Sequence, residues 1–170
     1  EVARLLQASL AARLGHDGAP VPLIAETGGQ NAMVVDSSAL TEQAVADIVA
    51  SAFDSAGQRC SALRVLCVQR DGADRLIAML NGAVSELRVG DPRVLAVDIG
   101  PVIDRDAQAI VERHIEAMRA KGHSVTRPAA IDGDAHSQGS FVPPAVIEID
   151  QISELQREVF GPVLHVLRYE

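Results

Sequence analysis

Leu63-Arg-Val-Leu-Cys-Val-Gln69 predicts a strand that is buried on both faces, and this segment sets the expected architecture. Apolar side chains stand at both odd and even positions along it, whereas a half-exposed strand would alternate apolar with polar residues. A strand that is covered on both faces is typical of a parallel sheet with helices packed on each side.

Helical periodicity flanks this strand in both directions. Residues 41–53 repeat apolar side chains at helical spacing, and the polar residues of 36–41 are expected to cap that helix. After the strand, Asp71 is expected to cap a second helix, which runs to about Leu87 and is closed by Gly90–Pro92.

The rest of the chain continues this alternation of strands and helices. Further helices are expected over residues 1–14 and 105–121. Further strands are expected over residues 23–25, 32–35, 124–126, 141–149 and 163–169, and residues 127–140 are expected to form a polar loop. The predicted fold class is therefore α/β, a mainly parallel sheet with flanking helices whose active residues lie at strand ends.

Composition excludes several classes of function. A chain of 170 residues with a formal charge of −8 lacks the excess of lysine and arginine that attracts nucleic acid. No apolar run approaches the ~20 residues that span a bilayer, and no signal peptide is visible. The two cysteines, Cys60 and Cys67, lie close together without a secretory context, which favours reduced thiols in a cytoplasmic protein.

Metal and dinucleotide motifs are absent from the sequence. The five histidines show no paired ligand spacing, and no Cys-x-x-Cys occurs, so no metal site is expected. No Gly-x-Gly-x-x-Gly occurs either, so the chain has no dinucleotide fingerprint of its own.

The most informative chemistry lies in two segments, Glu26-Thr-Gly-Gly29 and Asp54-Ser-Ala-Gly-Gln-Arg-Cys-Ser61. They pair a carboxylate that can act as a general base with a thiol that can act as a nucleophile. Taken singly, Cys60 favours a buried structural cysteine, and Glu26 a solvated carboxylate at a strand end; the surrounding motifs change both interpretations.

Together with Glu158-Val-Phe-Gly-Pro162, these segments resemble the aldehyde dehydrogenase superfamily. The family reads Glu-x-Gly-Gly, Gly-Gln-x-Cys and Glu-x-Phe-Gly-Pro in the same order. The resemblance implies the family's catalytic-domain fold, with Cys60 as the nucleophile that forms a thiohemiacetal and then a thioester, and Glu26 as the base that activates water. The Cys60 N–H is expected to stabilise the oxyanion.

The resemblance also implies binding roles for neighbouring residues. NAD is the implied cofactor, with Glu158 bonding the nicotinamide ribose and Phe160 beside the ring. Thr27 and Gly28 are expected to contribute to the cofactor site, and Ser61 and Arg59 to contact the aldehyde substrate.

The longer segments around Glu26 and Cys60 are similar to those of the branch of the family that oxidises L-glutamate γ-semialdehyde to glutamate in bacterial proline catabolism. In bifunctional enzymes of that branch FAD belongs to a separate proline dehydrogenase part. Another semialdehyde dehydrogenase, or a non-catalytic structural or assembly module of the family, remains an alternative.

The resemblance divides the chain in two. Residues 1–24 are expected to be the tail of a preceding NAD-binding domain and its connection, and residues 25–170 a catalytic domain truncated at its C-terminus. The expected partners are therefore the missing NAD-binding and proline dehydrogenase domains, in a parent that is a homo-oligomer. The chain alone is expected to be inactive.

Overall fold

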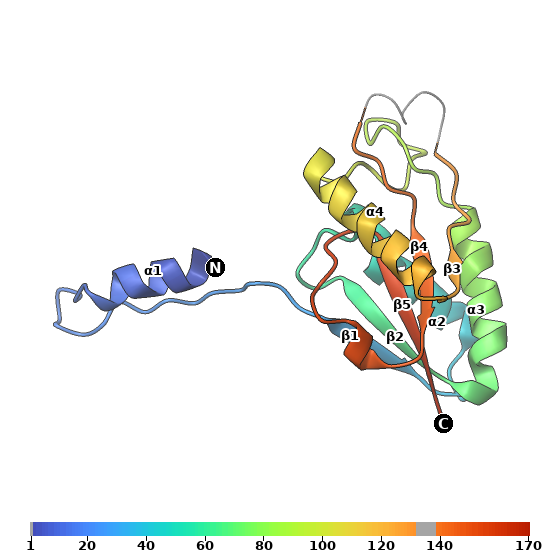
Figure 1. Ribbon diagram of the computed structural model, residues 1–170, viewed down its shortest axis with the longest axis horizontal. Helices are drawn as coiled ribbons and strands as arrows, with labels where there is room; N and C mark the ends of the chain where they lie inside the picture. Colours follow the sequence, from blue (N-terminus) through green and yellow to red (C-terminus); the bar gives the residue numbers. More distant parts are fainter. Residues whose placement is uncertain (1, 132–138) are drawn as a thin grey trace.

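A five-stranded sheet with the order β1-β2-β5-β4-β3 organises the chain in the computed structural model, which describes residues 2–131 and 139–170 (Figure 1). The strands are β1 (Asn31–Val35), β2 (Leu63–Gln69), β3 (Val125–Thr126), β4 (Ala145–Ile149) and β5 (Val163–Tyr169). The first four in this spatial order run parallel, and β3 pairs antiparallel with β4. The predicted α/β fold with a mainly parallel sheet is confirmed.

Helices cover both faces of this sheet. The covering helices are α2 (Thr41–Phe53), α3 (Arg70–Ser85) and α4 (Arg105–Ala120), while α1 (Val2–Ala11) lies apart from the sheet; η1 (Asp54–Gly57) and η2 (Ile152–Glu154) are short 3-10 turns. In Figure 1, α4 crosses the face of the sheet that is turned to the viewer, and α2 and α3 lie behind it. The predicted strand 63–69 is therefore an interior strand, between β1 and β5, and is covered on both sides, as its apolar pattern requires.

The core fills the space between these layers. The fully buried side chains come from every layer: Ile48, Phe53, Leu66, Leu80, Ile115, Ile147 and Leu164. In contrast, α1 has no buried residue, and Figure 1 shows it away from the sheet on an extended connection. We call residues 2–30 the N-terminal arm.

One predicted strand is wrong. Residues 23–25 form no strand, because a strand is defined by a hydrogen-bonded neighbour and residues 21–30 pair with no strand of the described chain. Two other elements are shorter than predicted: α1 ends at Ala11, and β4 begins at Ala145, since Pro143 and Pro144 have no N–H to donate to a ladder.

The predicted helix caps are also wrong, although the helices are confirmed. Leu40 is the N-cap of α2 and makes no side-chain bond, while Asp36 accepts hydrogen bonds from the N–H and hydroxyl of Ser38. Asp71 lies inside the first turn of α3, where a carboxylate favours the helix dipole without capping it. The predicted loop 127–140 falls partly outside the described residues.

No helix in the described part of the chain is both long and apolar enough to cross a membrane.

Candidate active site

The three sequence motifs meet at the amino-terminal edge of the sheet. Gly29 precedes β1, Cys60 precedes β2 and Glu158 precedes β5. These three strands are neighbours and parallel, so the segments that enter them lie side by side. Active residues were expected at strand ends, and open α/β sheets usually bind ligands at the carboxyl ends. Here the motifs gather at the opposite end.

The Cys60 loop is held in an unusual backbone conformation. Ser55 and Ala56 have φ of 57° and 53°, a left-handed region that costs non-glycine residues energy. Gly57 follows with φ 65°, and a Cβ there would collide with the carbonyl of Gly161. The cysteine motif thus packs directly on the Glu-x-Phe-Gly-Pro element, and the contact admits only glycine.

Cys60 itself is exposed at the end of this loop. Among the described residues its main-chain N–H has no hydrogen-bond acceptor, so that donor remains available to an oxyanion. Cys67 differs, because it lies half-buried inside β2 and desolvation raises the pKa of its thiol. Of the two thiols, Cys60 is the one that a substrate can reach.

Asn31 joins the end of the glutamate motif to the cysteine loop. Its side-chain nitrogen donates to the carbonyls of Cys60, at 2.8 Å, and Ala62, at 3.0 Å. Glu26 and Thr27 are exposed on the N-terminal arm, and Glu26 makes no hydrogen bond or ion pair within the described chain. The structure therefore fixes the end of this motif beside Cys60 and leaves the Glu26 carboxylate free.

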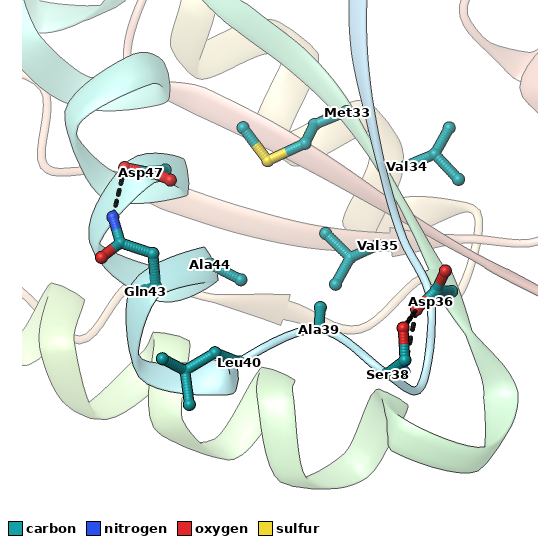
Figure 2. A pocket seen from close by; sticks show the side chains of 10 residues that line it. All are labelled: Met33, Val34, Val35, Asp36, Ser38, Ala39, Leu40, Gln43, Ala44 and Asp47. Carbon is teal, nitrogen blue, oxygen red and sulfur yellow. Dashed lines mark hydrogen bonds between the residues drawn. The ribbon is translucent and has the colours of Figure 1, made fainter.

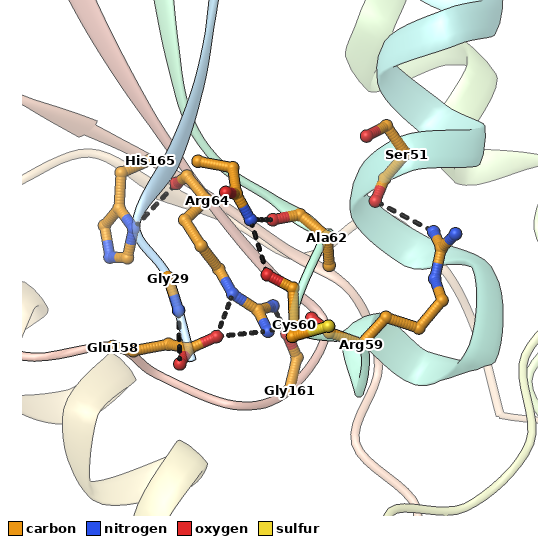
Figure 3. Close-up of polar contacts among 10 residues, drawn as sticks. Gly29, Ser51, Arg59, Cys60, Ala62, Arg64, Glu158, Gly161 and His165 are labelled. Atoms are coloured by element: carbon orange, nitrogen blue, oxygen red, sulfur yellow. Dashed lines mark hydrogen bonds and ion pairs between the residues drawn. The ribbon is translucent and has the colours of Figure 1, made fainter. Parts of the chain in front are cut away.

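Glu158 is the best-anchored of the predicted site residues (Figure 3). Its Oε1 accepts from Nε of Arg64 at 3.2 Å and from Nη2 at 3.0 Å, and its Oε2 accepts from the Gly29 N–H at 3.2 Å. Gly28 has φ 119°, and a Cβ on it would collide with Oε2. The Glu158 carboxylate is thus held between the Arg64 guanidinium of β2 and the Gly28–Gly29 pair.

Arg64 is the buried residue of this network that sequence reasoning missed. It is 1% exposed, donates also to the carbonyls of Gly161 and Arg59, and lies with Cζ 5.3 Å from the ring centroid of Phe160. Phe160 keeps 44% of its surface exposed. The missed signal was an arginine inside an otherwise apolar strand, because a buried charge requires partners.

The two residues predicted to contact substrate are placed differently. Arg59 donates to the carbonyls of Ala50 and Ser51, so its cation lies at the C-terminus of α2, where a helix dipole favours it. Ser61 is exposed next to Cys60. Their substrate roles stay predictions.

A pair of histidines lies under the site. Nδ1 of His165 is 3.2 Å from the Arg64 carbonyl and must donate to it, so Nε2 of the neutral ring accepts from Nε2 of His114 at 2.8 Å. His165 is buried, and desolvation together with His114 lowers its pKa to about 4. The pKa of His114 is also lowered by burial. Both rings are therefore neutral at pH 7.

One cluster in the described residues has the composition of a metal site. Ligand atoms of His123, Asp150 and Glu154 lie within 4.8 Å of one another. His123 Nε2 pairs with Glu154 Oε2 at 2.5 Å, while Glu154 Oε1 accepts from the N–H groups of Asp150 and Gln151. These contacts explain the cluster as an ion pair that closes the turn η2.

A hollow also lies at the carboxyl end of β1, the end where α/β sheets commonly bind ligands (Figure 2). Its polar side chains bond one another: Ser38 donates to Asp36, and Gln43 donates to Asp47 at 3.1 Å. They are not aimed at a common point, in contrast to the groups around Cys60.

Comparison with known proteins agrees with the motifs. The model of the aldehyde dehydrogenase family matches residues 2–170. The chain is 62% identical over 99% of its length to the bifunctional protein PutA of Klebsiella aerogenes, and 60% identical to that of Escherichia coli. It spans 13% of the length of each. A 1-pyrroline-5-carboxylate dehydrogenase of Geobacillus kaustophilus is 37% identical over 84% of the chain, which spans 27% of that protein.

Solved structures give the same result for the fold. A crystal structure of a PutA protein superposes with a TM-score of 0.88 at 48% identity, covering 99% of this chain and 16% of that one. Betaine aldehyde dehydrogenase from Staphylococcus aureus in complex with NAD+ superposes with a TM-score of 0.78 at 29% identity, covering 84% of this chain and 29% of that one.

Proposed function

Because the chain belongs to the aldehyde dehydrogenase family, we propose that it is the catalytic portion of an NAD-dependent L-glutamate γ-semialdehyde dehydrogenase acting in proline catabolism. The identities to PutA proteins and to a 1-pyrroline-5-carboxylate dehydrogenase support this substrate over other aldehydes. The observation that carries the proposal is the Asn31–Cys60 hydrogen bond of 2.8 Å, which seats the segment following Glu26 beside an exposed thiol.

Cys60 is the nucleophile in this proposal. Its thiolate adds to the aldehyde carbon, and the oxygen that becomes negative accepts a hydrogen bond from the free Cys60 N–H. The thiohemiacetal loses its C–H hydride, the C=O bond re-forms, and a thioester on Cys60 remains.

Glu26 acts in the second half of the reaction. It lies two residues from Gly28, hence within about 7 Å of the glycine that touches Glu158, because each residue extends the chain by at most ~3.6 Å. Its exposed carboxylate takes a proton from water, and the resulting hydroxide attacks the thioester carbonyl and releases the carboxylic acid and the Cys60 thiolate.

The residues of the cofactor half fit a nicotinamide nucleoside. A carboxylate has about four lone-pair sites, and Glu158 uses three of them on Arg64 and Gly29, so Oε2 can still accept from a ribose hydroxyl. Phe160 offers a half-exposed aromatic face. Gly28 stands beside the carboxylate, with Thr27 directly before it in the chain. When bound, NAD+ supplies the hydride acceptor.

A substrate survey of the full-length protein that carries this segment tests the proposal. NADH formation is measured with L-glutamate γ-semialdehyde, succinate semialdehyde and betaine aldehyde. We expect kcat/KM to be at least about tenfold higher for the first, since pockets discriminate by that factor per missing group. Equal or higher values for another aldehyde would overturn the substrate, and NADH formation with none of them would favour the non-catalytic alternative.

A further inference from the structure

Arg64 links the parts of the assembled site, directly or through Glu158. Among the charged residues that the structure describes, it has the largest fully buried side chain. It stands near the start of β2, an interior strand between β1 and β5. A guanidinium has five N–H donors in a planar fork. Here the fork reaches Oε1 of Glu158 and the carbonyls of Gly161 and Arg59.

These partners belong to separate motifs (Figure 3). The Arg59 carbonyl is the peptide oxygen directly before Cys60, and Glu158 and Gly161 bracket Phe160. Through Oε2 of Glu158 the network continues to the Gly29 N–H. Arg64 therefore connects the cysteine loop, the glutamate motif and the Glu-x-Phe-Gly-Pro element within hydrogen-bond distance.

The position of Arg64 is itself fixed. Its main-chain carbonyl accepts from His165 on β5, and Val65 beside it pairs with His165 in the sheet register. Its Cζ lies 5.3 Å from the centre of the Phe160 ring, within the range of a cation–π contact. Both side chains that are expected to hold the nicotinamide half of the cofactor thus rest on one guanidinium.

We propose that Arg64 is the positioning residue of the cofactor half of the site, holding Glu158 and Phe160 in the orientation that binds the nicotinamide riboside. This inference rests on the proposed function. Arg64 touches neither substrate nor cofactor, and it acts by presenting Oε2 of Glu158 and one face of Phe160. A lysine cannot replace it, because a single ammonium cannot satisfy the carboxylate and two carbonyls in one plane.

A merely structural ion pair makes a different prediction. Loss of a buried pair leaves an uncompensated charge and destabilises the whole fold, so the KM values for aldehyde and cofactor and the melting temperature would all respond. Positioning predicts a selective effect on the cofactor that disappears once Glu158 no longer carries its charge.

The test compares Arg64→Lys with the matched control Arg75→Lys, an exposed arginine on α3 that pairs with Glu42. Both are made in the full-length protein carrying this segment. For Arg64→Lys we expect the KM for NAD+ to rise about tenfold to hundredfold, the usual effect of losing a hydrogen bond to a charged group. The KM for the aldehyde should stay within about twofold, because Gly57 and Asn31 hold the Cys60 loop without Arg64.

Glu158→Gln completes the test. In that background Arg64→Lys should change the KM for NAD+ by less than about twofold, because both changes remove the same interaction. A KM for NAD+ within twofold of the parent in Arg64→Lys, or additive effects of the two substitutions, would overturn the inference.

If Arg64→Lys does not fold, Glu158→Gln alone decides, because it breaks the same pair from its partly exposed end, and an unchanged KM for NAD+ overturns the proposal. Should the unmodified protein form no NADH from any aldehyde, the proposed function fails. If the unmodified protein is active but these substitutions do not change the KM for NAD+, only the proposed role of Arg64 is excluded.

Discussion

The N-terminal arm and the sheet body, residues 31–131 and 139–170, both contain helices with the same apolar spacing, but only the helices of the body bury their apolar residues. In α1 the apolar residues recur at helical spacing, yet Leu5 is 67% exposed and no residue of the helix is buried. In α2 the same spacing buries Val45, Ile48 and Ala52 against the sheet. Periodicity therefore predicts a helix, whereas burial requires a complementary surface, and within the described residues the body provides one for α2 but not for α1.

The same contrast runs through the active site. Glu158 and Cys60 belong to the body and are fixed by Arg64, Gly57 and Asn31. Glu26 belongs to the arm and has no partner within the described residues. The proposed cofactor half of the site is thus fixed by contacts within the described residues, whereas the proposed base makes none.

The largest effect should come from the nucleophile. Cys60→Ala in the full-length protein should lower kcat for aldehyde oxidation by at least about 10⁴-fold, because removing a covalent nucleophile removes the whole pathway. Steady-state NADH formation measures it. The matched control is Cys67→Ala in β2, which should retain kcat within about twofold. Near-parent turnover by Cys60→Ala would end the covalent mechanism.

The base on the arm should matter less than the nucleophile on the body. Glu26→Gln should lower kcat about 10²- to 10⁴-fold, the range for losing a general base, and leave NAD+ binding unchanged. Stopped-flow NADH formation should then show a burst followed by slow turnover, because thioester hydrolysis becomes limiting. Glu42→Gln, an exposed glutamate on α2, is the control. Absence of both the burst and the rate loss would remove Glu26 from the mechanism.

Substitutions in the body and in the arm should differ in their effect on the free energy of unfolding. Leu66→Ala in β2 removes a fully buried side chain and should lower the free energy of unfolding by about 2–5 kcal/mol. Leu5→Ala in α1 should change it by less than about 0.5 kcal/mol, because the side chain is already in water. Urea unfolding of both variants decides this. A large cost for Leu5 would show that α1 packs on the body in solution.

The buried histidine of the body should give stability a dependence on pH. The pKa of His165 falls from 6.5 to about 4 on folding, so the unfolded chain binds more protons between these values and stability increases with pH there. The contribution is complete above pH ~6.5 and is lost by pH ~4, about 3 kcal/mol in all.

His165→Asn isolates this contribution, because Asn has no titration and keeps a donor for the Arg64 carbonyl. The variant should be less stable at pH 7 and should show a smaller loss of stability between pH 7 and 4.5. An unchanged pH dependence in urea titrations would mean that other groups cause it.

The elements of the body could be predicted from sequence because each has a local signal. β2, β5 and α2 match their predicted ranges, because apolar runs and helical spacing can be recognised in the sequence without knowing which elements pack beside them. The strand over 23–25 was wrong because pairing depends on a neighbour that the sequence does not reveal. The caps were wrong because Asp36 bonds Ser38 instead, and because α3 begins before Asp71, which lies inside its first turn.

Site residues could be predicted from the sequence only where they belong to recognisable motifs. Cys60 and Glu158 came from such motifs, and the structure brings their loops together. The network around Arg64 could not be derived from sequence, because its partners stand up to 97 positions away and join through the strand order β1-β2-β5. An arginine in a buried strand predicts that hydrogen-bonding partners exist but does not identify them.

The central claim, that Cys60 carries the acyl group and Glu26 releases it, is tested most directly by trapping. Glu26→Gln is mixed with L-glutamate γ-semialdehyde and NAD+, quenched in acid within the burst, digested and mapped by mass spectrometry. The account predicts an acyl adduct on the peptide that contains Cys60, sensitive to hydroxylamine as a thioester is. NADH formation without that adduct, or an adduct on Cys67 instead, would contradict it.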